Sequence, residues 1–401
     1  MELVKLVTAG LLLWVGVSFR THAQELSPGA DHRTGESRPV VGAIRWDAWY
    51  GEGSPVSEVE KTLGPRKFHH RLPFFAQVIS PSEVSINGDA QSVIEQEIAF
   101  AADAGLDYWA FVDYWDRGNL GIALRRYREA PDKQGIRYCL IEEGRRLDHV
   151  GTPGWPRLVA HFQDPHYLHV LGGRPLLFIY GLPEAVSRAD FESLAQQTTA
   201  AGLEKPYIVL MGWNPQADAA AMEKFGFSAV SAYAAGAGYE WEQWPYERLT
   251  EHVRTAYWEV CRQQRLETVT FATAGWDPRP RVEHPTPWVR VTPRPDPTPP
   301  AQQQPLVDAV MATPDQLAGH LREALAWTQQ NRDLNPANAV IVYGWNENDE
   351  GGWLIPTLQP GGGVDRARVD ALAKVLRGPI GGSADVNSTP GGPETPGGPE
   401  R

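Results

Sequence analysis

The feature that most constrains the fold is an eightfold alternation of short apolar runs with longer segments of helical periodicity. Each run is rich in β-branched or aromatic residues, which favour extended strands. Strands that alternate with helices are typical of repeated βα units. The predicted strands are Val40–Ile44, Tyr108–Val112, Arg137–Ile141, Pro175–Ile179, Tyr207–Met211, Ala229–Ser231, Val269–Thr273 and Val340–Tyr343.

The segments after these strands carry helix start and stop signals. Thr313-Pro314-Asp315 supplies a cap, a first-turn proline and an acid, and Gly105 and Gly202 each follow an alanine-rich stretch. Eight βα units predict a single (β/α)8 TIM barrel over residues 38–377, with its active site at the C-terminal ends of the strands. The predicted helices are Ala90–Ala104, Leu120–Ala130, Trp155–Phe162, Arg188–Ala201, Asp218–Lys224, Pro245–Gln264, Pro314–Gln330 and Asp365–Leu376.

The first residues have the pattern of a targeting segment. Lys5 precedes the apolar stretch Leu6–Phe19, and Ala23 offers a small residue at a cleavage position. We therefore expect residues 1–23 to be a signal peptide and the protein to be secreted or periplasmic, with no membrane span after removal of the signal. The alternative is an uncleaved anchor, for which the apolar stretch is short.

Two further stretches lie outside the alternation. Residues 284–305 are dense in proline and predict a long loop insertion between the seventh strand and its helix. Residues 378–401 are rich in Gly and Pro and end in two copies of TPGGPE. Such a composition buries little apolar area, which predicts a disordered tail.

Charge and cysteine content exclude several classes of protein. A net charge of −12 argues against a nucleic-acid partner, because phosphate binding needs a basic surface. Cys139 and Cys261 are the only cysteines, and both lie in apolar runs, so we expect two buried thiols and no disulfide. His69-His70 lacks a third ligand at metal spacing and is expected at the surface of the first loop. The sequence predicts neither a metal nor a cofactor.

Carboxylates and flat aromatic side chains follow the predicted strands at their C-terminal ends. Sugars present C–H faces that stack on aromatic rings and hydroxyls that bond carboxylate, amide and guanidinium groups. The chain has no GxGxxG, GxxxxGK[ST], GxSxG or HExxH motif. The sequence therefore predicts a carbohydrate substrate. The predicted binding residues are Trp46, Asp47, Asp113, Trp115, Glu142, Trp213, Tyr233, Trp276, Asp277, Arg279, Trp345 and Asn346.

Glu347 and Glu350 are the predicted catalytic residues, in the run that follows the eighth strand. Cleavage of a glycosidic bond usually takes one protonated and one ionised carboxyl group. Two carboxyls held close together raise the pKa of one of them, which suits that division. On spacing alone the alternative, a solvated acidic turn, stays open.

Some of the other candidates have structural alternatives. Asp113 and Asp277 either bind substrate hydroxyls or hold Arg279. Glu142 and Glu143 alternate along the third strand, so at most one of them points inward. The alternative role of the tryptophans is as apolar core at the barrel mouth.

Four stretches resemble the WbsX-like group, described as glycosyltransferases, and the related glycoside hydrolase family 99, the endo-α-mannosidase family. Asn346–Gly351, followed by Leu354 and Pro356, resembles the signature NEWxEGxxLEP of that group. Asn348 replaces the Trp of the signature, and Asp349 stands where a small residue or His is expected. Ile355 replaces the Glu that precedes the final Pro. The other matching stretches are Ser92–Trp115, Asp164–Pro175 and Trp276–Arg281.

This resemblance implies a role for each residue of the signature. Glu347 would deprotonate the substrate's own 2-hydroxyl, and Glu350 would protonate the leaving oxygen, through a retaining route with a 1,2-anhydro sugar. Asn346 would hold a carboxylate or a substrate hydroxyl. We therefore expect a secreted, retaining glycoside hydrolase acting on an oligo- or polysaccharide. The alternatives are a non-catalytic glycan-binding protein on a hydrolase barrel and a transglycosylase.

Overall fold

The computed structural model describes residues 38–115, 118–150, 154–236, 244–290 and 311–378. These residues belong to one compact unit that begins at Arg38. The predicted signal peptide, residues 291–305 of the predicted proline-rich loop and residues 379–401 of the predicted tail lie outside the described residues. Within the described residues, no helix has the length and apolar character that crossing a membrane requires.

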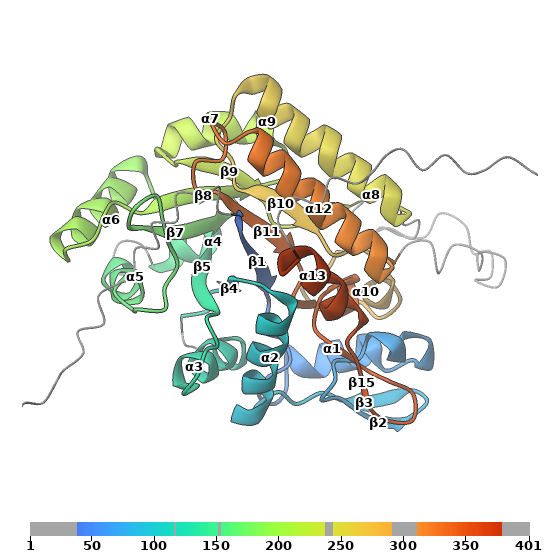
Figure 1. Cartoon of the computed structure of the whole chain (residues 1–401). Helices are drawn as coiled ribbons and strands as arrows, with labels where there is room; N and C mark the ends of the chain where they lie inside the picture. Colours follow the sequence, from blue (N-terminus) through green and yellow to red (C-terminus); the bar gives the residue numbers. More distant parts are fainter. Residues whose placement is uncertain (1–37, 116–117, 151–153, 237–243, 291–310, 379–401) are drawn as a thin grey trace, which may run out of the picture. The chain divides into compact units, whose positions relative to one another are not determined.

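Eight parallel strands form a barrel surrounded by helices (Figure 1). Their order in the sheet is β10-β11-β1-β4-β5-β7-β8-β9. A parallel bridge between Val230 and Thr268 joins the last strand to the segment leading into the first, and the N–H of Val269 donates to the carbonyl of Val230 at 3.1 Å. The barrel is therefore closed. Its strands are β1 (Val40–Arg45), β4 (Tyr108–Val112), β5 (Arg137–Glu143), β7 (Arg174–Tyr180), β8 (Tyr207–Gly212), β9 (Ala229–Ala232), β10 (Thr270–Thr273) and β11 (Ala339–Tyr343).

All eight predicted barrel strands are confirmed, with ends that differ by at most two residues. They are apolar on both faces because one face lines the barrel interior and the other packs on the helices. All residues of β4, β8, β9 and β10 are buried, for example. This two-sided burial explains why continuous apolar runs, rather than alternating ones, marked the strands in the sequence.

The predicted helices are confirmed, with local differences. The helix predicted from Asp218 begins at Pro215, and the one predicted from Leu120 begins with a 3-10 turn. The predicted helix Pro245–Gln264 is interrupted by a π-helical segment, Val253–Trp258. The last helix begins at Ala367, because Asp365 pairs with Thr357 in a short antiparallel ladder. The helices are α1 (Val56–Leu63), α2 (Gln91–Ala104), α3 (Ile122–Glu129), α4 (Gly144–Val150), α5 (Trp155–Phe162), α6 (Arg188–Ala200), α7 (Pro215–Phe225), α8 (Tyr246–His252), α9 (Glu259–Gln264), α10 (Arg279–Glu283), α12 (Pro314–Gln330) and α13 (Ala367–Leu376).

The loop after β1 contains structure that the sequence did not predict. It holds α1, the 3-10 helix Arg66–Arg71 and the hairpin of β2 (Gln77–Ser80) with β3 (Glu83–Ser85). The 3-10 helix brings Arg71 to the residues that follow β10, where its guanidinium donates to the carbonyl of Asp277 at 2.9 Å. As predicted, His69 and His70 lie toward the surface, half-buried and exposed. Further short strands are β6 (His169–Val170), β12 (Asn346–Glu347), β13 (Gly352–Trp353), β14 (Thr357–Leu358) and β15 (Val364–Asp365).

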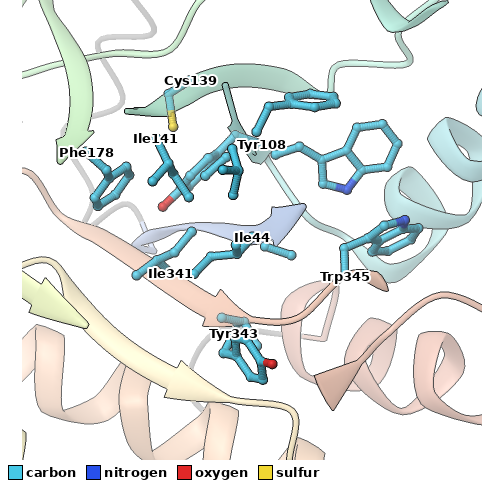
Figure 2. Close-up of a cluster of buried hydrophobic side chains, with 14 of the residues drawn as sticks. Ile44, Tyr108, Cys139, Ile141, Phe178, Ile341, Tyr343 and Trp345 are labelled. Carbon is cyan, nitrogen blue, oxygen red and sulfur yellow. The ribbon is translucent and has the colours of Figure 1, made fainter. Parts of the chain in front are cut away.

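The barrel interior is filled by large apolar side chains from several strands (Figure 2). Tyr108 is fully buried, and its hydroxyl donates to the carbonyl of Val340 at 2.9 Å. A side chain at Gly42 would begin 2.3 Å from the Tyr108 ring, so glycine at that position makes room for the ring. Cys139 and Cys261 are both buried free thiols, which confirms the prediction of no disulfide. The packed interior leaves the strand ends as the place for a binding site.

Candidate active site

A pocket of about 830 Å³ opens where the barrel strands end. The residues that line it end or follow the eight barrel strands, so the pocket lies at the C-terminal mouth of the barrel. Its lining consists of Trp46, Ser54, Pro55, Val112, Tyr114, Leu120, Glu143, Arg146, Tyr180, Trp213, Tyr233, Ala234, Ala235, Gly236, Trp276, Arg281, Trp288, Glu347 and Glu350.

A tight turn after β11 brings both predicted catalytic glutamates to the pocket wall. β12 and β13 pair as a two-residue antiparallel ladder, and the 3-10 turn Asn348–Glu350 joins them. The turn ends at Gly351, whose φ of 84° lies in the left-handed region that glycine adopts without steric cost. A Cβ there would stand 2.4 Å from the backbone nitrogen of Asp277, so the residues after β10 pack directly on the turn.

Glu347 is buried, with 2% of its surface exposed. Its Oε1 accepts a hydrogen bond of 2.8 Å from the Tyr233 hydroxyl. Its Oε2 lies 3.6 Å from Nη2 of Arg281 and has no hydrogen-bond partner among the described residues. Burial, together with the charge of Glu350, raises the pKa of Glu347 well above its usual range. Both effects favour the protonated form of this side chain more than in an exposed glutamate.

Glu350 is held on both carboxylate oxygens. Its Oε2 accepts a hydrogen bond of 2.5 Å from the Tyr343 hydroxyl, and its Oε1 pairs with Nη1 of Arg281. The same guanidinium bonds Asp349 through two nitrogens, Nε at 2.7 Å and Nη2 at 3.0 Å. Arg281 is itself buried and lies 4.9 Å from the centre of the Trp46 ring. One buried cation thus faces three carboxyl groups of the turn.

Four of the twelve predicted binding residues line the pocket: Trp46, Trp213, Tyr233 and Trp276. Trp46 follows β1 and Trp213 follows β8, which are four strands apart in either direction around the eight-stranded ring. These two tryptophans therefore lie on opposite sides of the mouth. Trp213 is 55% exposed, which leaves most of its ring available to a ligand.

Three predicted binding residues instead support the turn that carries Glu347 and Glu350. The Asn346 amide donates to Asp47 at 2.9 Å, and its oxygen accepts from the backbone N–H of Trp46 at 3.0 Å. The Trp345 indole donates to Glu97 at 2.7 Å. Arg45 pairs with both Asp47 and Glu97, which completes a buried network that ties β1, α2 and the turn together. Asn346 thus holds a carboxylate, that of Asp47, and neither catalytic glutamate.

Three other predicted binding residues lie around Arg157 and do not line the pocket. Arg157 pairs with Asp113 and, at 2.5 Å, with Glu142. The Trp115 indole donates to Glu142 at 3.0 Å. Burial and the nearby Asp113 raise the pKa of Glu142 well above its usual range. The neighbouring Glu143 lines the pocket, so one glutamate of this pair faces the mouth, as strand alternation requires.

Asp277 and Arg279 also lie outside the lining and bond each other. Arg279 donates to Asp277 at 2.6 Å and 2.5 Å, and Arg71 pairs with the same carboxylate. Of the two roles predicted for Asp277, the geometry places it in the second, holding Arg279. Burial opposes ionisation of Asp277, but Arg71 and Arg279 outweigh it and lower the pKa of the carboxyl to about 2.

Several lining residues were absent from the predicted set. Tyr114, Glu143 and Tyr180 directly follow or end strands, so the rule that gave Trp46 and Tyr233 also pointed to them. Arg281 is the second arginine of Trp276–Arg281, a stretch already singled out by resemblance. Trp288 lies in the proline-rich segment, where no periodicity indicates direction; it contacts Trp46 with ring centres 5.8 Å apart. Within the described residues, no group of three His, Cys, Asp or Glu side chains is placed to hold a metal.

A known protein family matches the part of the chain that carries the two glutamates of this site. Residues 153–364, more than half of the chain, match the sequence model of the family described as glycosyltransferase WbsX. The chain belongs to the WbsX family. The family assignment confirms the resemblance seen in the sequence, and the matched range includes Arg281, Glu347 and Glu350. No curated protein matches the chain.

Among solved structures, this WbsX-family chain is similar to the family 99 endo-α-mannosidase of Bacteroides thetaiotaomicron. The complex of that enzyme with bis-tris propane matches with a TM-score of 0.51 at 12% identity, over 84% of this chain and 96% of that one. A second structure of the enzyme matches over the same shares at 11% identity, also with a TM-score of 0.51. At this identity the likeness establishes the (β/α)8 fold, which confirms the predicted fold class.

Proposed function

We propose that this WbsX-family protein is a glycoside hydrolase that cleaves an oligo- or polysaccharide, with Glu347 and Glu350 as its catalytic pair. The observation that carries the proposal is the placement of two buried glutamates, three residues apart, on the wall of one pocket. The surroundings of the two carboxyls differ, since the Arg281 guanidinium pairs closely with Glu350 but lies 3.6 Å from Glu347. Unequal surroundings of this kind separate an acid from a base.

The rest of the pocket suits a sugar chain. Trp46 and Trp213 provide aromatic surfaces on opposite sides of the mouth that the glutamates also line. Glu143 and Tyr180 add groups that bond hydroxyls. The kinship with an endo-α-mannosidase fold is in keeping with this substrate class.

The family is described as a glycosyltransferase, and many glycosyltransferases use nucleotide-sugar donors. The pocket is less suited to such a donor. A diphosphate needs unengaged cations or a glycine-rich loop. The basic side chains in the described lining are Arg146 and Arg281, and both pair with carboxylates: Arg146 with Glu143 at 3.2 Å, and Arg281 with Asp349 and Glu350. We therefore favour hydrolysis, or transfer between sugars, over transfer from a nucleotide.

Two finer features belong to the same proposal. Retention of configuration follows from the resemblance of the glutamate pair to the family 99 signature. Action outside the cytoplasm follows from the signal-peptide pattern of residues 1–23. Fractionation of cells that express the full chain, with sequencing of the mature N-terminus, tests the second feature.

The test of activity is a screen of the purified protein against α- and β-linked oligosaccharides and bacterial and algal polysaccharides, with products followed by NMR. We expect cleavage with the anomeric configuration retained. Glu347→Gln and Glu350→Gln should each lower turnover by at least about 10²-fold. Glu192→Gln, an exposed change on α6, is the matched control and should leave turnover unchanged.

Three outcomes would contradict parts of this proposal. Binding of a glycan with no cleavage, unaffected by either glutamine variant, would indicate a non-catalytic glycan-binding protein. Products that carry an added sugar at high acceptor concentration would indicate a transglycosylase. Inverted products would remove the retaining step while leaving hydrolysis in place.

A further inference from the structure

Trp288 is a large exposed ring on the wall of the pocket, in the segment that follows α10. Its exposed fraction is 42%, whereas those of Glu347 and Glu350 are 2% and 5%. Its ring partner among the described residues is Trp46, with ring centres 5.8 Å apart and 65° between the ring planes. A single exposed apolar side chain is ordinary on a convex surface, but one that lines a concave pocket offers a surface to a ligand.

The backbone before Trp288 is held by hydrogen bonds. The N–H of His284 donates to the carbonyl of Pro280 at 3.0 Å, at the end of α10. The N–H of Val289 donates to the carbonyl of Thr286 at 3.1 Å, so Trp288 lies within a turn. Thr286 is buried, which fixes the start of that turn against the rest of the protein. The position of the indole therefore follows from hydrogen-bonded backbone on its N-terminal side.

A row of contacts leads from Glu350 outward to Trp288. Arg281 pairs with Glu350, and its guanidinium lies 4.9 Å from the centre of the Trp46 ring. The indole N–H of Trp46 donates to the Tyr114 hydroxyl at 2.9 Å, which fixes the ring that contacts both Arg281 and Trp288. Arg281 is buried and Trp288 is exposed, so the row ends toward solvent with Trp288 outermost.

A sugar unit is the ligand that suits this end of the row, because the C–H face of a pyranose ring stacks on an indole. Arg281 and Trp46 stand between Trp288 and the glutamates, so a unit stacked on Trp288 is not the unit whose bond lies at the glutamates. On the other side of the mouth, the exposed Trp213 contacts Tyr180 with ring centres 6.2 Å apart. A glycan of several units can therefore contact the pocket well beyond the bond that is cleaved.

We propose that Trp288, together with Trp46, forms an outer subsite that stacks the C–H face of a sugar unit other than the one attacked. This subsite makes the protein prefer longer glycans over shorter ones. The inference rests on the proposed glycoside hydrolase function and names a specificity-determining residue for it. Trp288 lies in the proline-rich segment, outside the four stretches that resemble the family. It contributes binding and takes no part in proton transfer.

The test is the dependence of kinetics on substrate length. The substrates are oligosaccharides of one linkage, from the shortest that the wild type cleaves to those several units longer, prepared from the polysaccharide that the screen identifies. In Trp288→Ala, we expect the KM of the longest substrate to rise about tenfold, because a stacking surface is lost. Its kcat should change less than about twofold, because binding remote from the reacting bond acts on ground and transition states alike. The shortest substrate should change less than about twofold in both constants.

Two further variants control this measurement. Trp288→Phe keeps a flat apolar ring of smaller area, so its KM for the longest substrate should lie between those of wild type and Trp288→Ala. Ile79→Ala removes an exposed apolar side chain of the β2–β3 hairpin, outside the pocket lining, and should behave like wild type at every length. Unfolding in urea checks that all three variants are folded. An equal change at every length, or no change at any length, would overturn the outer subsite.

Titration calorimetry with the longest oligosaccharide keeps this inference separable from the function. Cleavage by the wild type with an unchanged Kd in Trp288→Ala would remove the subsite and leave the hydrolase in place. Binding by the wild type without cleavage would remove the hydrolase, and the Kd would still decide the subsite: about tenfold weaker binding by Trp288→Ala supports it, and equal binding overturns it. A wild type that neither binds nor cleaves any glycan of the screen would overturn both.

Discussion

The Tyr233 hydroxyl donates a hydrogen bond of 2.8 Å to Glu347, from the end of β9 to the turn after β11. A donated hydrogen bond stabilises the ionised carboxylate, so this contact lowers the pKa of Glu347 against the larger raising effects of burial and Glu350. Tyr233 after β9 and Glu350 after β11 therefore shift the pKa of Glu347 in opposite directions.

Removal of that donor gives the first prediction. In Tyr233→Phe the pKa of Glu347 should rise further, so the limb of the pH profile that reports ionisation of Glu347 should move to higher pH. A neutral hydrogen bond contributes roughly 0.5 to 1.5 kcal/mol, so we expect kcat/KM to change by about three- to tenfold. Steady-state kinetics across pH measures both effects, and a limb that moves to lower pH would contradict the prediction.

The second prediction concerns the network below the turn. Asn346→Ala removes the amide that bonds the buried Asp47 carboxylate, and hydrogen bonds to charged groups contribute roughly 1.5 to 3 kcal/mol. We expect the free energy of unfolding in urea to fall by about that amount. Gln196→Ala, an exposed change on α6, is the control and should stay within about 0.5 kcal/mol of wild type. Equal stability of the two variants would show that the network carries no net free energy.

The third prediction concerns the exposed Trp213. Because 55% of this side chain is accessible, Trp213→Ala should leave the free energy of unfolding nearly unchanged. Loss of a stacking surface worth about 1.4 kcal/mol should raise the Kd for the cognate glycan roughly tenfold, as measured by titration calorimetry. Leu182→Ala, also at an exposed position but outside the pocket lining, should bind like wild type. An unchanged Kd for Trp213→Ala would remove this ring from the binding site.

The fourth prediction concerns acid stability. Arg71 and Arg279 hold the folded pKa of Asp277 at about 2, below its usual 3.8. A depressed folded pKa adds stability that is present above pH 3.8 and is lost as the pH falls through about 2, and here amounts to roughly 2 kcal/mol. The difference in unfolding free energy between wild type and Asp277→Asn should therefore shrink between about pH 4 and pH 2. A difference that stays constant over that interval would contradict the pairing.

The barrel was predictable from the sequence because each strand is buried on both faces. Runs such as Tyr108–Val112 need no partner to be recognised, and the chain order of βα units leaves few topologies. The same logic placed Glu347 and Glu350 at the pocket, since a residue that directly follows a barrel strand points to its mouth.

The side-chain pairings made by the loops could not be predicted from the sequence. Arg71 lies about 200 positions before Asp277, yet the 3-10 helix of the first loop brings the two into contact. Asp113 and Glu142 satisfied the strand-end rule, but Arg157 on α5 engages both of them outside the pocket lining. No local pattern encodes such pairings, because they depend on how segments far apart in the chain pack.

The sequence by itself determined the barrel, its family and the position of the two predicted catalytic glutamates, because hydrophobic periodicity and a local motif lie in consecutive residues. The contacts of those glutamates were decided only by the tertiary structure. They depend on which carboxylate oxygens Arg281 reaches, and that follows from the packing of α10 against the turn after β11.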